Sequence, residues 1–230
     1  MTYNQIISEI KKLGTKKNVL GMAKFGIRPK VKVCGTSIVD VRKIAKRAGR
    51  NHQLALRLWN SGFHEARHLA NLVAEVDKLT KAQMNKWIKD FDSWDICDQT
   101  CSNLFDKVPW AHEWAISLTK RKPEFEKRTG FVLMATLSVH DKKAGNKDFI
   151  KFFSYIKKEA IDERNFVKKA VNWALRQIGK RNINLNKQAV KLAREIKKID
   201  SRSAHWIAND AIRELTSEAV QKRLIIENKK

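Results

Sequence analysis

A carboxylate follows an indole by one helical turn in the segment DSWDICD, residues 92–98. Asp92 or Ser93 can cap a helix that begins here, and Asp95 then falls in its first turn, where the helix dipole stabilises a negative charge. Asp98 lies four residues after Trp94, too far into the helix for capping to explain its charge. We therefore interpret Asp98 as a functional carboxylate beside an aromatic ring. The alternative is a salt bridge to one of the many arginines.

A second segment, RNFVKKAVNWALRQIGK (residues 164–180), combines cations with an aromatic ring. Lys169, Trp173, Arg176 and Lys180 follow one another in steps of four, three and four, so they share one face of a helix. Three cations around one indole suit a surface that contacts a phosphate backbone and one sugar or base. The alternative is a solvated basic face in which Trp173 belongs to the core.

The segment HEARH, residues 64–68, matches the H-E-x-x-H pattern. On a helix this pattern places two imidazoles on one face for zinc, with the glutamate, here Glu65, as a base. The pattern arises easily by chance, and no glycine-turned third ligand follows it. We therefore expect no metal ligand and no cofactor, and a zinc hydrolase built on His64 and His68 is kept as an alternative.

The charge of the chain restricts its partners. The 230 residues include 48 Lys and Arg against 24 Asp and Glu, a formal net charge of +24. Such an excess repels itself in the folded state, which indicates a polyanionic partner, most often nucleic acid. An anionic membrane surface or a generally basic proteome would give the same excess. Motifs for nucleotide binding, serine hydrolases and zinc deaminases are absent from the sequence.

Helical periodicity runs through most of the chain, and only three prolines and nine glycines interrupt it. No segment alternates as a half-buried strand does, so we predict an all-α fold. Ser37, Thr80, Ser93, Pro109, Pro123 and Ser201 are start signals. Beyond an amphipathic N-terminal helix, the predicted helices are 37–48, 52–59, 63–75, 80–91, 93–105, 109–120, 123–140, 147–158, 164–180, 186–198 and 201–215.

A weak repeat is visible among these helices. Comparable segments occur around Arg67, Arg128, Lys169 and Trp206, and the last three are separated by 41 and 37 residues. Helix pairs that repeat every 40 to 47 residues or so are HEAT-like, and stacked pairs form a solenoid with a concave face. A non-repetitive helical bundle is the alternative.

These segments together resemble the DNA alkylation repair family of HEAT-like-repeat glycosylases, the AlkD-like type. The resemblance covers about residues 4–224 and is carried by three segments: residues 58–67, residues 92–98 and residues 167–176. It implies a single curved solenoid, residues 1–230, with a basic concave face that binds double-stranded DNA. We expect the tail after about residue 224 to be frayed.

The resemblance also implies roles for individual residues. The catalytic aspartate of the family follows a tryptophan by four residues, which matches Asp98 and Trp94. A second tryptophan in a W-x-L-R stretch matches Trp173, followed by Arg176, and an arginine that opens a repeat helix matches Arg128. Phe25 stands where the family has a tyrosine, which removes a hydroxyl. Ser93 stands where the best-known members have the first of two tryptophans.

The implied activity is a DNA glycosylase of base excision repair. It would hydrolyse the N-glycosidic bond of cationic N3- or N7-alkylated purines in duplex DNA, without flipping the base into a pocket. Our alternative is a non-catalytic DNA-binding member of the same family, and a protein scaffold is disfavoured by the charge. With an odd count of three cysteines and no signal peptide or membrane span, we expect a monomer in the cytoplasm, near the nucleoid in a prokaryote.

Overall fold

The computed structural model describes residues 1–228, with side chains through residue 226. Within that range the chain is helical, and its one β feature is an isolated bridge between Lys32 and Phe63. The helices are α1 (Tyr3–Leu13), α2 (Lys16–Lys24), α3 (Ile38–Ala48), α4 (His52–Trp59), α5 (His64–Val73), η1 (Val76–Lys78), α6 (Lys81–Lys89), α7 (Trp94–Asn103), η2 (Phe105–Lys107), α8 (Ala111–Thr119), α9 (Glu124–His140), α10 (Asn146–Ile150), α11 (Phe153–Glu159), α12 (Asn165–Gly179), α13 (Ile183–Ile196), α14 (Arg202–Leu215) and α15 (Glu218–Asn228). The predicted all-α class is confirmed.

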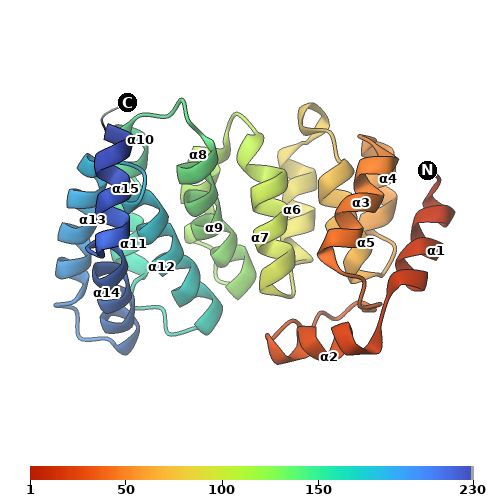
Figure 1. Ribbon diagram of the computed structural model, residues 1–230, viewed down its shortest axis with the longest axis horizontal. Coiled ribbons are helices and arrows are strands. Elements are labelled where there is room, and N and C mark those ends of the chain that lie inside the picture. The colour runs from red at the N-terminus through yellow and green to blue at the C-terminus, as the bar shows by residue number, and fades with distance from the viewer. Residues whose placement is uncertain (229–230) are drawn as a thin grey trace. The chain divides into compact units, whose positions relative to one another are not determined.

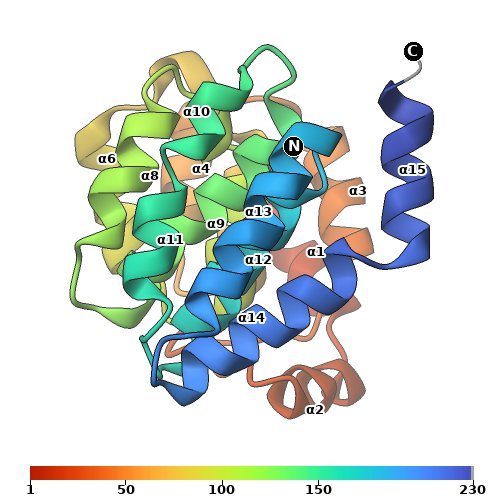
Figure 2. The ribbon, with the colours of Figure 1, turned by 90° about the vertical axis from the view of Figure 1, so that its left-hand side faces the viewer.

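The helices group into two compact units, Met1–Val108 and Pro109–Lys230. In unit 1, α5 packs between α3 and α7 and also contacts α4. In unit 2, α12 packs against α9 on one side and α14 on the other, and α13 covers α12 and α14. Figures 1 and 2 show these helices stacked as successive layers within each unit.

Side-chain caps fix where many of these helices begin. The Oγ atoms of Ser37 and Ser201 and the Oγ1 of Thr80 each accept a hydrogen bond from the backbone three residues later, as the sequence predicts. Ser93 also precedes its helix, but its hydroxyl donates to Asp95 instead of capping. The sequence therefore located the start of α7 correctly and gave Ser93 the wrong contact.

Several contacts between neighbouring layers of a unit share the same sequence separation, as expected for a repeat. In unit 1 the separation is 31 residues: Trp59 Nε1 donates to Asp90 Oδ2 at 2.8 Å. In unit 2 it is 38 residues: Asn172 Nδ2 donates to Asp210 Oδ2 at 2.7 Å. The predicted HEAT-like repeat is confirmed, and each unit has its own period.

Each unit has an apolar core between its layers. Trp59 and Trp87 stack in unit 1 with ring centroids 4.0 Å apart and planes 2° from parallel. In unit 2, α9 crosses α8 so closely at Gly130 that an added Cβ would lie 2.7 Å from the Ala115 carbonyl oxygen. Only glycine allows that approach, so Gly130 determines how deeply α9 is buried.

Some boundaries differ from the predicted ones. The stretch 16–24 is helical as α2 although the sequence did not indicate it, and 147–158 is divided into α10 and α11. The helix expected from 186 begins earlier, at Ile183, because Asn182 caps it. α15 is described through Asn228, and its Leu224 side chain is buried. The tail expected to fray after about residue 224 includes residues 229–230, which lie outside the described residues. None of the helices in residues 1–228 is both long and apolar enough to cross a bilayer.

Candidate functional site

The first turn of α7 carries the residues of the predicted chemistry in unit 1. Trp94 opens the helix, and its indole Nε1 donates a hydrogen bond of 3.0 Å to the backbone oxygen of Phe25. Phe25 ends α2 and its ring is 75% exposed. Asp98 lies one turn further along α7 and is half-buried. Unit 1 thus joins Phe25 to Trp94 and places the carboxylate on the same helix.

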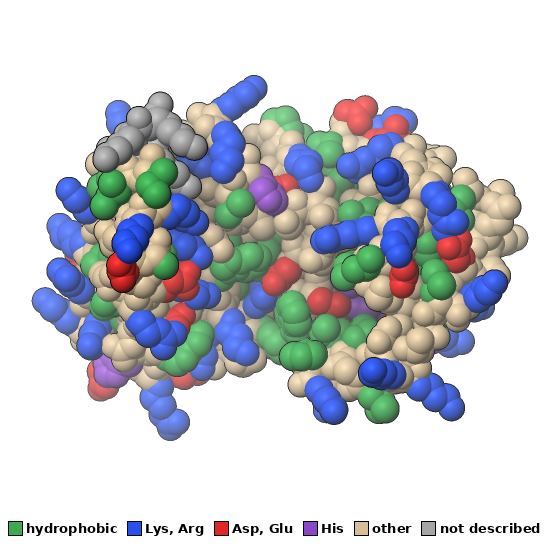
Figure 3. Space-filling model, in the orientation of Figure 1, with side chains coloured by type: hydrophobic (Ala, Val, Ile, Leu, Met, Phe, Trp, Pro, Cys, Tyr) green, Lys and Arg blue, Asp and Glu red, His purple; other side chains and the backbone are tan. Residues whose placement is uncertain are grey.

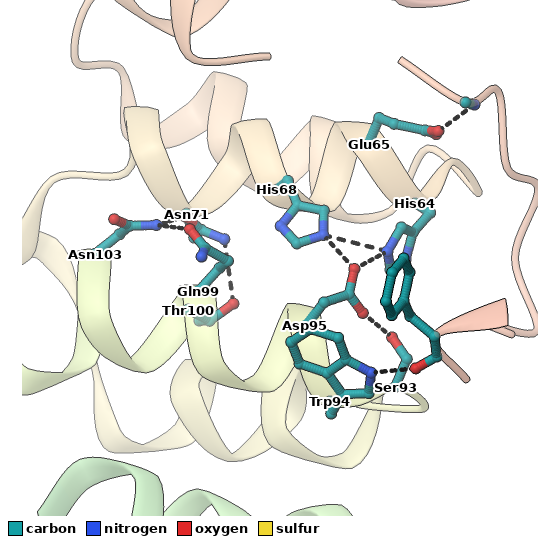
Figure 4. A network of polar contacts seen from close by, with 12 residues as sticks. His64, Glu65, His68, Asn71, Ser93, Trp94, Asp95, Gln99, Thr100 and Asn103 are labelled. Atoms are coloured by element: carbon teal, nitrogen blue, oxygen red, sulfur yellow. Dashed lines mark hydrogen bonds and ion pairs between the residues drawn. The ribbon is translucent and has the colours of Figure 1, made fainter. Parts of the chain in front are cut away.

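A cluster of two imidazoles and one carboxylate lies directly beside Trp94 (Figure 4). Asp95 Oδ2 is 2.7 Å from His64 Nε2 and 3.0 Å from His68 Nε2. The two Nε2 atoms are 3.2 Å apart. The other carboxylate oxygen, Oδ1, accepts a hydrogen bond of 2.5 Å from Ser93 Oγ. Asp95 therefore lies in the first turn, where the helix dipole stabilises its charge, and it also connects α7 to α5.

Burial and these contacts set the charges of the cluster. Burial acts to raise the pKa of Asp95, but the hydrogen bonds from His64 and His68 outweigh it and hold that pKa well below its usual range. Burial dominates at His68 and lowers its pKa, which favours the neutral imidazole. The cluster is thus an ionised carboxylate facing histidines, of which His68 is held neutral.

The glutamate of the H-E-x-x-H segment is not part of this cluster. Glu65 is buried and accepts hydrogen bonds from the backbone nitrogens of Cys34, at 3.0 and 3.1 Å, and Gly35, at 2.6 Å. Figure 4 shows it directed away from the imidazoles. The Glu65 carboxylate thus holds the Cys34–Gly35 loop that precedes α3. It is therefore not placed to act as a general base.

Further along the same interface, α5 and α7 are joined by amides and a hydroxyl. Asn71 is buried, and its Nδ2 donates to Thr100 Oγ1 at 3.3 Å. Its Oδ1 accepts from Asn103 Nδ2 at 3.1 Å. These bonds fix the rotation of α7 about its axis, and with it the direction in which Trp94 and Asp98 face.

The predicted stripe on α12 lies on the less buried side of that helix. Lys169 is exposed, and Trp173, Arg176 and Lys180 are half-buried. Within the described part of the chain, Lys169 has no ion-pair partner and Trp173 makes no hydrogen bond or ring contact. The buried residues of α12 are on the opposite side. Trp173 is therefore not a core residue.

Two cations of the stripe are paired with acids of α14. Arg176 Nη1 forms an ion pair with Glu214 and lies 3.4 Å from Asp210 Oδ2. Lys180 Nζ lies 2.5 Å from Glu214 Oε1. Burial acts to raise the pKa of Glu214, but the two cations lower it below its ordinary value. Of the three predicted cations, Lys169 is the one without an acidic partner among the described residues.

Arg128 is buried, with 5% of its surface exposed. Its Nη1 donates a hydrogen bond of 2.5 Å to the Phe166 carbonyl oxygen, 38 residues away in the next layer. The guanidinium thus supports the start of α12. Figure 3 shows Lys and Arg side chains over much of the visible face of both units, so the basic surface extends well beyond the predicted residues.

A sequence model of the DNA alkylation repair enzyme family matches residues 6–215, nearly the whole chain. The chain belongs to this family. Among curated proteins, none matches the chain.

A solved structure has the same fold. It is described as "a new family of proteins related to the HEAT-like repeat DNA glycosylases with affinity for branched DNA structures", with a TM-score of 0.76 and 18% identity over 93% of this chain and 95% of that one. A designed armadillo repeat protein is far less similar, with a TM-score of 0.37, 13% identity and coverage of 76% of this chain and 92% of that one. The family and the first structure together confirm the resemblance seen in the sequence.

The His64–His68–Asp95 cluster was missed by sequence reasoning. The H-E-x-x-H spacing predicted that two imidazoles share a face of α5, and they do. Nothing in the sequence linked them to a carboxylate 27 residues beyond His68. The 31-residue period of unit 1 is the signal that could have found it, because His64 and Asp95 are 31 residues apart.

Proposed function

We propose that the protein is a DNA glycosylase that hydrolyses the N-glycosidic bond of cationic N3- or N7-alkylated purines in duplex DNA, with Asp98 as the catalytic carboxylate. One observation carries this proposal: Trp94 and Asp98 are one turn apart on α7, and α7 is held to α5 by buried polar bonds. A half-buried carboxylate beside an indole, fixed in this way, is what charge stabilisation requires.

The chemistry needs little from the protein. An alkylated purine already carries a positive charge, so its bond to deoxyribose is weakened and the leaving group needs no strong acid. Positive charge develops at the anomeric carbon as the bond breaks, and a nearby carboxylate stabilises it and can position a water molecule. Trp94 would pack against the sugar and exclude water, and its π face attracts a cationic base.

Unit 2 supports DNA binding in this proposal. Among the described residues, Trp173 offers an indole that makes no hydrogen bond or ring contact, and Lys169 offers a charge without an ion-pair partner. Arg176 and Lys180 already share the carboxylate of Glu214, and Arg176 also faces Asp210, so they contact phosphate only by sharing those partners. Arg128 acts from within the protein, by holding the start of α12.

The direct test is release of free base from methylated duplex DNA. Asp98→Asn should lower the rate by about 100- to 1,000-fold, while DNA affinity stays equal or increases because a negative charge is removed. Asp77→Asn is the matched control, since Asp77 is an exposed aspartate of η1 and its loss should change neither quantity. Equal excision by wild type and Asp98→Asn would show that another group is the catalyst.

A second candidate is DNA binding without excision. The solved structure of the same fold is described as having affinity for branched DNA, and Phe25 and Ser93 depart from the family pattern of known excising members. Binding of a four-way junction would be compared with binding of a linear duplex of equal length. Tighter junction binding together with no base release from any alkylated substrate would favour this second function.

A further inference from the structure

Three potential metal ligands meet at one point between α5 and α7. They are His64 Nε2, His68 Nε2 and Asp95 Oδ2, separated by 2.7, 3.0 and 3.2 Å (Figure 4). They are the group of histidine, cysteine and acidic side chains, among the described residues, whose ligand atoms converge closely enough to hold a metal ion. His64 is fully buried, and the side chains of His68 and Asp95 are only 7% and 13% exposed.

Two neutral imidazoles leave part of this arrangement unsatisfied. A neutral ring carries one N–H donor and one acceptor nitrogen. If both Nε2 atoms carry the proton, both can donate to Asp95 Oδ2, but the two donor nitrogens lie only 3.2 Å apart. If either Nε2 lacks it, an imidazole lone pair faces a carboxylate oxygen. A cation at the meeting point would let all three atoms act as acceptors, while each Nδ1 still has no partner among the described residues.

We propose that His64, His68 and Asp95 bind one divalent transition-metal ion through His64 Nε2, His68 Nε2 and Asp95 Oδ2. With metal–ligand distances of about 2.0–2.1 Å, the edges of an octahedral site are about 2.9 Å and those of a tetrahedral site about 3.3 Å. The three observed separations lie around the octahedral value. Two histidines and one carboxylate on a single face of the ion form a facial triad, which suits Fe²⁺ or Zn²⁺ and leaves positions for water.

The environment fits a metal in charge as well as in shape. Metal ligation uses neutral imidazoles and an ionised carboxylate, the two ligand types that meet here. The nearest cation along α5, Arg67, points elsewhere: its Nη1 donates to the Asp90 carbonyl oxygen at 3.0 Å and its guanidinium lies over the Trp59 ring. With neutral imidazoles the cluster carries one negative charge. A bound divalent ion would therefore give the site a net charge of only +1.

The ion would stabilise the contact between α5 and α7 and would not take part in hydrolysis. A hydrolytic site of the H-E-x-x-H type needs its glutamate as a base, and Glu65 is bound to the backbone of Cys34 and Gly35. The site joins α5 to the first turn of α7, next to Trp94. Metal binding therefore stiffens the start of the helix that carries Asp98, and this inference stands whether or not the protein excises bases.

The surroundings of the two rings limit the affinity. Nδ1 of His64 and Nδ1 of His68 have no hydrogen-bond partner in the described part of the chain. Such partners usually fix the ring and are worth about 10- to 100-fold in affinity. We therefore expect binding to be weaker by about that factor than at a site with such partners, and removable with a chelator.

The test measures metal binding. The protein is first treated with a chelator, and Zn²⁺ or Co²⁺ is then added in separate experiments. Equilibrium dialysis with elemental analysis should give one ion per chain, and the unfolding temperature should rise with free metal concentration. Co²⁺ should give weak visible bands typical of six-coordination and no thiolate charge-transfer band, because the cysteines take no part. Asp95→Asn and His68→Ala should each weaken binding by about 100-fold or more.

The matched control is His112→Ala in unit 2. His112 Nε2 lies 3.0 Å from Asp141 Oδ2, so this variant loses a histidine from an ordinary histidine–aspartate pair and should keep the metal. Circular dichroism would establish folding, and Asp95→Asn tests the site if His68→Ala does not fold. Absence of stoichiometric binding, or equal binding by Asp95→Asn and wild type, would overturn the proposal without affecting the excision assay.

Discussion

In unit 1, neighbouring layers are joined at α5 and α7 by two imidazoles that share one carboxylate oxygen. In unit 2 the layers at α12 and α14 are joined by Arg176 and Lys180 against Asp210 and Glu214. Arg213 also pairs with Asp210, so this second set brings three cations against two carboxylates, and it is partly exposed to water. The first is buried, and its one formal charge is negative when the imidazoles are neutral.

This difference indicates which contacts between layers of a repeat protein can also serve as a ligand-binding site. Ion pairs that neutralise each other can join layers wherever water screens them, but they leave little for a ligand. A buried cluster with converging lone pairs costs more to bury, and it retains the capacity to bind a cation. Unit 1 carries both this cluster and the Trp94–Asp98 pair, whereas unit 2 carries mainly ion pairs between layers and the face that we propose for DNA contact.

The comparison is tested most severely by removing one glutamate from each unit. Glu65→Ala leaves a buried and a partly buried backbone N–H group without an acceptor, so we expect a loss of about 2–5 kcal/mol in the free energy of unfolding. Glu214→Ala removes a partly exposed ion pair and should cost about 1 kcal/mol or less. Urea denaturation of both variants measures this, and similar losses would remove the distinction between the units.

The aromatic residue of unit 2 gives the next largest effect. Trp173→Ala should weaken DNA binding by about tenfold, because an aromatic ring stacked on a nucleotide is worth roughly 1–3 kcal/mol. Trp206→Ala is the control: Trp206 is 41% exposed and already engaged by Lys168, whose Nζ is 5.4 Å from its ring. Fluorescence anisotropy at one salt concentration compares them, and an unchanged affinity for Trp173→Ala would remove Trp173 from the interface.

The salt dependence of binding distinguishes paired from unpaired cations on α12. Lys169→Ala should reduce the slope of log K against log salt by about 1, the contribution of one phosphate contact. Arg176→Ala should change the slope less, because Glu214 already neutralises that charge. A titration series in salt decides this. A larger change for Arg176 would mean that DNA displaces Glu214 from it.

The smallest expected effect is the pH dependence that Glu214 contributes in unit 2. The pKa of Glu214 is lower in the folded protein than in the unfolded chain, so its stabilising contribution is complete above the ordinary glutamate pKa and is lost as pH falls through the folded value. The stability difference between wild type and Glu214→Gln should therefore shrink as pH falls below about 4. A difference that persists in acid would contradict this origin.

Several site residues could be placed from the sequence because local rules govern them. Helical spacing put Lys169, Trp173 and Lys180 on one face, and the start signal at Ser93 correctly located the start of α7 although its hydroxyl does not cap the helix. The roles of Arg176 and Arg128 were harder to predict. Both meet partners 38 residues away, and a spacing within one helix says nothing about what the next layer presents.

What the sequence by itself determined is the all-α fold, the family and the helix that carries Asp98, because periodicity, caps and motifs act over a few residues. Only the tertiary structure decided that Asp95 meets His64 and His68, and that Glu65 turns to the backbone of the Cys34–Gly35 loop. The physical reason is that a charge in a protein interior must find its partner across layers, and stacking of repeats, not distance along the chain, selects that partner.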